Sequence, residues 1–145
     1  MSVYVDSGVL VKLYVRERNS DIAARSVRHH TWVPLNGLME LELRNTFQML
    51  EARNVLSDAQ RAAAEHFLEL DCVEGRLHRT ALNWTEILHH SIALSRGFTT
   101  RTLARSLDIL HVATALHQRC SLFITADNRQ ASFARLCGLQ VEHLS

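Results

Sequence analysis

The chain has 145 residues, 47% hydrophobic and 21% charged, with a formal net charge of +1 at pH 7. This composition excludes a disordered chain and suits one globular domain, which we expect to span residues 1–145. A net charge near zero excludes binding to nucleic acid through overall charge alone, and no apolar run approaches the ~18 residues that a membrane span needs.

Apolar stretches of strand length alternate along the chain with longer stretches of helical periodicity. The expected strands and helices, in chain order, are 3–6 (strand), 7–15, 19–30, 32–35 (strand), 37–53, 57–72, 77–80 (strand), 83–96, 106–119, 122–125 (strand), 128–137 and 141–143 (strand). We expect a polar loop at 97–105. The alternation predicts an α/β fold, a three-layer αβα sandwich around a short parallel sheet.

Local signals set some of these boundaries. Pro34 argues for an irregular second strand, because proline has no amide hydrogen for a sheet. Ser57 and Asp58 offer an N-cap, with Arg61 rather than an acid at the position expected for a capping box. Gly138 is a typical helix stop.

Four acidic residues stand where this fold could gather carboxylates. Asp6 ends the first strand and Asp127 follows the fourth, while Glu42 and Asp108 lie in largely apolar helices. In open parallel sheets, ligands bind beyond the carboxyl ends of the strands, so Asp6 and Asp127 are the pair most expected to meet. Clustered carboxylates repel each other unless a divalent metal offsets their charge. Each acid also has a simpler explanation, as a helix cap or a surface charge.

Arginine supplies every basic side chain except Lys12. Arg101, Arg105 and Arg129 are close in sequence to the acids. Their guanidinium groups could hold the phosphates of a nucleic acid, or could balance the acids when no metal is bound.

Four sequence blocks together resemble the PIN domain family, and within it the VapC-like toxins. The blocks are Val5-Asp6-Ser7-Gly8-Val9-Leu10-Val11-Lys12-Leu13-Tyr14, Glu42-Leu43-Arg44-Asn45, Ser106-Leu107-Asp108-Ile109-Leu110-His111-Val112-Ala113-Thr114-Ala115-Leu116 and Thr125-Ala126-Asp127. They occur in the family's order and span almost the whole chain. The resemblance implies a parallel sheet of strand order 3-2-1-4-5 and a ribonuclease activity that depends on Mg²⁺ or Mn²⁺.

The resemblance also implies roles for individual residues. The catalytic set that it implies is Asp6, Glu42, Asp108, Asp127 and Thr125, with Asp6, Asp108 and Asp127 as metal ligands. Glu42 precedes Leu-Arg-Asn as in the family, whereas Glu40, roughly 200° away around the helix, is the fallback. The many histidines and the expected loop at 97–105 depart from the family pattern and bear on substrate choice.

The family association further implies RNA as substrate, a cognate antitoxin protein as partner, and a homodimer. The protein would then be a cytoplasmic toxin of a type II toxin–antitoxin pair, with no membrane partner. A non-catalytic interaction module that kept the PIN fold is the alternative. The sequence has no G-x-x-x-x-G-K-[ST] motif of a P-loop protein, and Gly8 stands where a haloacid dehalogenase-type hydrolase needs a second Asp.

The cysteines and histidines do not indicate a zinc site. Cys72, Cys120 and Cys137 are odd in number and lack C-x-x-C spacing, which argues for reduced thiols. The pairs His29-His30 and His89-His90 point about 100° apart on helices, which rarely suits one metal. We expect His111, one turn after Asp108, to be a hydrogen-bonded core histidine.

Overall fold

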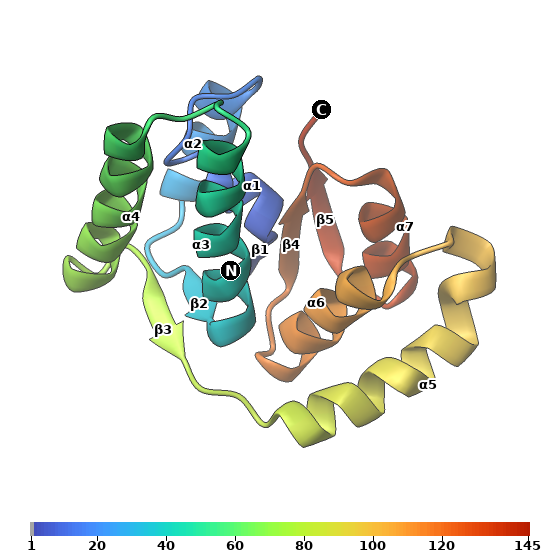
Figure 1. Ribbon diagram of the computed structural model, residues 1–145. Helices are drawn as coiled ribbons and strands as arrows, with labels where there is room; N and C mark the ends of the chain where they lie inside the picture. Colours follow the sequence, from blue (N-terminus) through green and yellow to red (C-terminus); the bar gives the residue numbers. More distant parts are fainter. Residues whose placement is uncertain (1) are drawn as a thin grey trace. The chain divides into compact units, whose positions relative to one another are not determined.

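The computed structural model describes residues 2–145. Strands and helices alternate along most of the chain (Figure 1). In order they are β1 (Val3–Val5), α1 (Ser7–Val11), α2 (Ser20–Arg28), β2 (Pro34–Asn36), α3 (Gly37–Ala52), α4 (Asp58–Val73), β3 (His78–Thr80), α5 (Trp84–Thr102), α6 (Ser106–His117), β4 (Leu122–Thr125), α7 (Asn128–Leu136) and β5 (Gln140–His143). The predicted α/β class, with short parallel strands flanked by helices, is confirmed.

The chain forms two compact parts. The terminal part combines the chain up to Asp6 with Leu82–Ser145, and the middle part is Ser7–Ala81. Each part has its own parallel sheet and its own buried apolar side chains.

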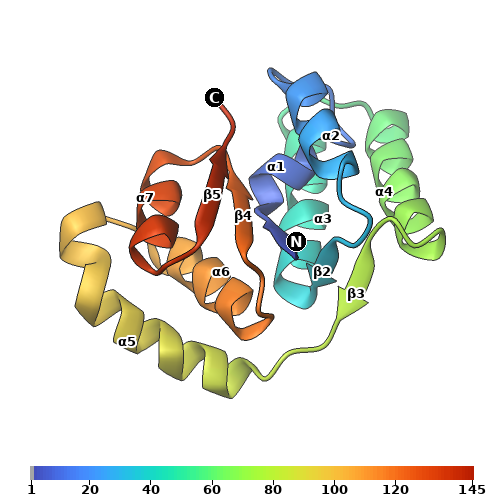
Figure 2. The ribbon, with the colours of Figure 1, turned by 180° about the vertical axis from the view of Figure 1, so that it is seen from behind.

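The terminal part is built on the sheet β1-β4-β5. Its register pairs Val5 with Ile124, and both side chains are fully buried. Tyr4 stacks on Phe123 with ring centroids 5.3 Å apart. Helix α7 packs on β4 and β5, and α5 packs along α6 and α7, as both views of the ribbon show (Figures 1 and 2). Strands β1 and β4 are parallel neighbours in this sheet, so their carboxyl ends lie side by side. Asp6 and Asp127 follow these two strand ends.

The middle part pairs β2 with β3 and packs α3 against α1 and α4. The buried side chains of α3 are Met39, Leu43 and Phe47, at helical spacing along one face. The Asn36 side chain accepts a hydrogen bond from the Met39 amide at 2.9 Å and so caps the start of α3. The apolar face and this cap explain why a helix begins directly after β2.

The predicted single sheet of strand order 3-2-1-4-5 is replaced by two parallel sheets, of order β1-β4-β5 and β2-β3. A strand inside a sheet needs hydrogen bonds on both of its sides. Strand β2 has only three residues and begins at Pro34, which has no amide hydrogen. These features suit an edge strand, and within residues 2–145 β2 pairs with β3 alone.

The predicted loop at 97–105 is wrong, because α5 continues to Thr102. Gly97 is a weak stop signal, and the following residues hold the helix in place. Phe98 contacts Phe133 of α7 edge-to-face, with centroids 6.1 Å apart, and the Thr102 hydroxyl donates to the Phe98 carbonyl. Leu103 then ends the helix in the left-handed region at φ 58°.

The end of α1 and the cap of α4 also differ from expectation. Helix α1 ends at Val11 rather than at residue 15, because the amides of Lys12 and Leu13 bond to carbonyls three residues back, which tightens the last turn. At the start of α4, Gln60 rather than Arg61 completes a capping box, with its side chain accepting from the Ser57 amide at 2.8 Å. No helix within residues 2–145 is long and apolar enough to cross a membrane.

Candidate functional site

Two of the predicted acids line one pocket of the terminal part. The pocket has a volume of about 440 Å³ and lies between the start of α6 and the turn from β4 into α7. Its lining residues are Arg105, Asp108, Ala126, Asp127, Asn128 and Arg129. Carboxylate and guanidinium groups thus share one polar cavity, as a site for a cation and a phosphate requires.

Asp127 owes its place to the turn after β4. The Asp127 amide donates to the Thr125 hydroxyl at 3.1 Å, and Asp127 Oδ1 accepts from the Gln130 amide at 2.8 Å. Asp127 is therefore the N-cap of α7, as the simpler explanation of this acid requires. The capping bond to Oδ1 fixes the orientation of the carboxylate, which lines the pocket.

Asp108 is held in the same manner at the start of α6. Its Oδ2 accepts from the Arg105 amide at 3.0 Å. The side chain is half-buried in the first helical turn, where the helix dipole favours negative charge. Asp108 therefore has both a capping role and a position on the pocket wall.

Asp6 follows β1 and is half-buried. Its amide donates to the Ile124 carbonyl at 2.9 Å, which extends the pairing of β1 with β4 by one residue. Asp6 Oδ1 accepts from Gln130 Nε2 at 3.3 Å. Asp6 does not line the pocket of Asp108 and Asp127, but Gln130 connects it to the same turn.

Gln130 is the residue of this region that sequence reasoning missed. Its side chain is buried, and its Oε1 accepts from the Thr125 hydroxyl at 2.6 Å. The sequence carries a signal of its burial but not of its partners, because Gln130 shares a helix face with Ala131, Phe133 and Ala134. A glutamine on an apolar helix face needs specific hydrogen-bond partners.

The donor set of this region suits Mg²⁺ or Mn²⁺. Both ions prefer oxygen ligands, and Mg²⁺ is usually held by one or two carboxylates while it keeps several waters. Asp108 and Asp127 satisfy that requirement on one pocket wall. Within residues 2–145, no group of three or more His, Cys, Asp or Glu side chains is close enough to hold a metal ion. Asp6, Asp108 and Asp127 therefore do not form a ready-made three-ligand cluster.

The three arginines near the acids differ in position. Arg105 and Arg129 line the pocket, whereas Arg101 does not. The guanidinium carbon of Arg101 lies 5.3 Å from the centroid of the Phe98 ring, a cation–π contact within α5. Arg105 and Arg129 are therefore pocket residues, whereas Arg101 packs on Phe98 of its own helix.

Both candidate glutamates lie on α3 of the middle part, and Glu40 is held in an ion-pair network. Its carboxylate accepts from Arg44 at 2.9 Å and from Arg79 at 2.9 and 3.1 Å, and both arginines also bind Glu69. The hydrogen bond from Arg79 is the main cause that lowers the pKa of Glu40. Glu42 is half-buried on the same helix.

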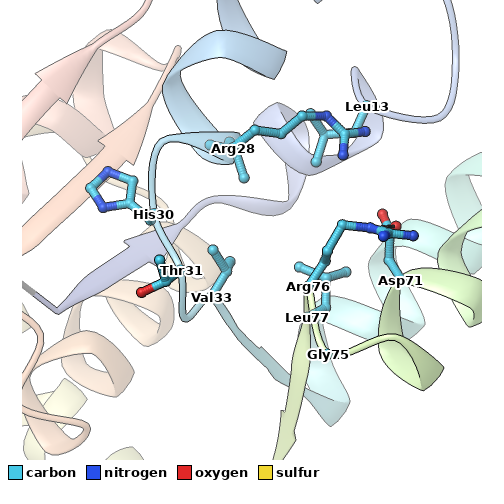
Figure 3. A pocket seen from close by; sticks show the side chains of 10 residues that line it. Leu13, Arg28, His30, Thr31, Val33, Asp71, Gly75, Arg76 and Leu77 are labelled. Carbon is cyan, nitrogen blue, oxygen red and sulfur yellow. Dashed lines mark hydrogen bonds and ion pairs between the residues drawn. The ribbon is translucent and has the colours of Figure 1, made fainter.

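A second pocket, of about 350 Å³, belongs to the middle part (Figure 3). It is lined by Leu13, Val27, Arg28, His30, Thr31, Val33, Asp71, Gly75, Arg76 and Leu77. Figure 3 shows the Arg76 guanidinium beside the Asp71 carboxylate, while Arg28 extends from the end of α2. Asp71 is buried and also accepts from the Tyr14 hydroxyl at 2.5 Å. The acid of this pocket is therefore already compensated by protein groups.

The remaining sequence expectations concern histidine and cysteine. His111 is buried, and its Nδ1 lies 2.7 Å from the Tyr4 hydroxyl, which confirms a hydrogen-bonded core histidine. Cys72, Cys120 and Cys137 are free thiols, of which Cys120 is buried. Burial raises the pKa of Cys120 and that of Cys137 to about 11, so both are protonated at neutral pH.

Several solved structures share the fold of this chain. VapBC2 from Rickettsia felis, solved bound to a DNA fragment from its promoter, has a TM-score of 0.66 and 12% identity, with 100% of each chain covered. FitAcB from Neisseria gonorrhoeae has a TM-score of 0.65 and 17% identity, covering 96% of this chain and 95% of that chain. VapC20 from Mycobacterium tuberculosis, described as a sarcin-ricin loop cleaving toxin, has a TM-score of 0.61 and 12% identity, covering 84% and 87%.

At these identities the likeness establishes the fold. The comparison with curated protein sequences finds no match. A comparison with protein families matches the PIN domain over residues 3–137, nearly the whole chain. The match includes Asp6, Glu42, Asp108, Thr125 and Asp127, the residues on which the sequence resemblance was based. The chain belongs to the PIN domain family.

Proposed function

We propose that this protein is a metal-dependent endoribonuclease, the toxin of a type II toxin–antitoxin pair. The observation that carries the proposal is the pocket in which Asp108 and Asp127 stand beside Arg105 and Arg129. Membership of the PIN domain family supports a nuclease, and the fold shared with VapC20, a toxin that cleaves the sarcin-ricin loop, supports RNA as substrate.

The acids have the first role in this proposal. Asp108 and Asp127 would hold Mg²⁺ or Mn²⁺ together with Asp6, and Glu42 would be the fourth acid of the set. A bound ion would supply positive charge against the scissile phosphate and would favour ionisation of the attacking water. The capping bonds of Asp108 and Asp127 pre-orient both carboxylates, so less ordering is needed when a cation binds.

The neighbouring side chains position the RNA and the acids. Arg105 and Arg129 bind phosphates next to the cleaved bond, because a guanidinium group offers paired donors to phosphate oxygens. The Thr125 hydroxyl is fully buried, donates to Gln130 and accepts from the Asp127 amide. Thr125 therefore acts by orienting Asp127 and Gln130.

A toxin of this kind needs a partner that restrains it. The fold shared with VapBC2 and FitAcB supports a cognate antitoxin protein as that partner. We further propose that the protein forms a homodimer and acts in the cytoplasm, where its RNA substrates are.

The test is cleavage of a mixed RNA pool, with and without Mg²⁺, by the wild-type chain and by Asp108→Asn. We expect cleavage only by the wild type with Mg²⁺. Asp21→Asn is the matched control, since Asp21 is an exposed acid of α2 paired with Arg16, and it should cleave like the wild type. If the wild type binds RNA but never cleaves it with Mg²⁺ or Mn²⁺, the protein is a non-catalytic interaction module and the proposal is wrong.

A further inference from the structure

We propose that Gln130 is a positioning residue of the acidic site, which sets the place of the Asp6 carboxylate relative to Asp127. The inference rests on the proposed function, because it assigns a role in holding the metal ligands. Gln130 itself is not a ligand in this account. It acts through hydrogen bonds that its buried side chain and its backbone amide donate.

One residue contacts both acids. The Gln130 amide donates to Asp127 Oδ1 at 2.8 Å, and its side-chain Nε2 donates to Asp6 Oδ1 at 3.3 Å. Asp6 and Gln130 are 124 positions apart in sequence. The two carboxylates, at the ends of β1 and β4, are therefore joined through a single residue of α7.

The neighbouring groups determine the orientation of the Gln130 amide. An ionised carboxylate only accepts hydrogen bonds, so the NH₂ group must face Asp6. The Thr125 hydroxyl accepts from the Asp127 amide at 3.1 Å and donates its own hydrogen to Gln130 Oε1 at 2.6 Å. Reversing the amide would lose the donor to Asp6 and would turn the NH₂ group toward Thr125.

Burial makes this arrangement stiff. Gln130 is 1% exposed and Thr125 is fully buried, so water does not compete for their hydrogen bonds. A buried amide is costly unless its polar atoms have partners, and an apolar residue would otherwise suit this face of α7. The side chains of Thr125, Gln130 and Asp6 form one hydrogen-bonded chain. We infer that its role is to hold the Asp6 carboxylate in place.

The consequence is measurable as metal affinity. Loss of a group that orients a metal ligand typically weakens metal binding by about 10- to 100-fold. Gln130→Met, a neutral substitution of similar length, removes the NH₂ group that donates to Asp6 Oδ1 and so loosens the placing of that carboxylate relative to Asp127. We expect Gln130→Met to raise the Mn²⁺ dissociation constant at least about tenfold, while Asp108 and Asp127 keep their own capping bonds.

The experiment is calorimetric titration of the full chain with Mn²⁺ in the absence of RNA, with melting of the metal-free protein measured in parallel. Thr125→Val, of the same shape, removes the donor that holds Oε1 and should weaken Mn²⁺ binding in the same direction. Because Thr125 also accepts from the Asp127 amide, the double variant should bind no better than Thr125→Val, and its loss of affinity should be smaller than the two single losses combined. Gln140→Met changes an exposed glutamine at the start of β5 and should bind Mn²⁺ like the wild type.

The outcomes separate this inference from the proposed function. If the wild type does not bind Mn²⁺, the proposed function fails. If the wild type binds Mn²⁺ and folded Gln130→Met binds it equally well, the positioning role is overturned while the nuclease stands. A merely structural Gln130 would lower the melting temperature of the metal-free protein without changing the affinity of the folded fraction. Should Gln130→Met not fold, Thr125→Val decides alone, and unchanged affinity in that variant overturns the role.

Discussion

Glu40 binds Arg79 through two hydrogen bonds, of 2.9 and 3.1 Å, that join α3 to β3. The same carboxylate accepts from Arg44, and Glu69 of α4 closes the network. Glu40 therefore has a structural role within the middle part, which supports Glu42 as the acid of the proposed site.

This difference predicts opposite effects for two neighbouring substitutions. Glu40→Gln removes a charge that two arginines share, so the free energy of unfolding should fall by about 1 kcal/mol, while RNA cleavage continues. Glu42→Gln should lower the cleavage rate. Urea denaturation and RNA cleavage, measured on both variants, check the assignment. Loss of cleavage in folded Glu40→Gln, with full cleavage by Glu42→Gln, would show that the glutamates were assigned in reverse.

The two pocket arginines should matter more for RNA than Arg101. In the cleavage-deficient Asp108→Asn background, Arg105→Ala and Arg129→Ala should each weaken RNA binding and reduce the slope of log K against log salt by about 0.7. Arg101→Ala is the control, because its guanidinium lies over the Phe98 ring. Binding isotherms at several salt concentrations give the slopes. A larger change for Arg101→Ala than for either pocket arginine would contradict this placement of the RNA phosphates.

Tyr14 should stabilise the middle part through Asp71. The carboxylate of Asp71 is buried, and Tyr14 donates to it at 2.5 Å while Arg76 binds its other oxygen. Burial, and then the hydrogen bond to Asp71, raise the pKa of Tyr14. Tyr14→Phe leaves the acid with one partner fewer and should cost about 1–3 kcal/mol of unfolding free energy. A double-mutant cycle with Asp71→Asn measures the coupling, and additive effects would exclude this interaction as the cause.

Two thiols should make the protein less stable at alkaline pH. Burial raises the pKa of Cys120 and of Cys137 from 9.0 to about 11 in the folded protein. Between these pH values the unfolded chain loses the thiol protons and the folded chain keeps them. The stabilisation is therefore complete below pH 9 and is lost as pH rises toward 11. Unfolding free energies measured from pH 8 to 11 should fall less steeply in a Cys120→Ala, Cys137→Ala variant, whereas equal slopes would refute the thiol contribution.

The sequence predicts those features that depend on residues close together in the chain. The strand ends at Asp6 and Asp127 follow from apolar runs and from the residues just after them, so the amino-acid sequence alone places both acids. Gly97 led to the wrong prediction of a helix end, because a glycine is a weak stop signal. Helix α5 continues past it, and Phe98 contacts Phe133 of another helix. Tertiary contacts of this kind leave no periodic signal in the sequence.

The role of Gln130 is hidden for the same reason, since its partner Asp6 is 124 residues away in the chain. The expected strand order rests on the family resemblance, whereas the missing amide hydrogen of Pro34 limits how the second strand can pair. The sequence therefore indicates Asp108 and Asp127, which line one pocket, but not the hydrogen bonds that hold them.

The most direct test of the acidic site is the cleavage of one defined RNA, with both new ends mapped, as Mg²⁺ is removed by a chelator and then restored. We expect that cleavage stops without the metal and returns with it, leaving a 5′-phosphate and a 3′-hydroxyl. Cleavage that persists in the chelator, with a 2′,3′-cyclic phosphate at the new end, would contradict it.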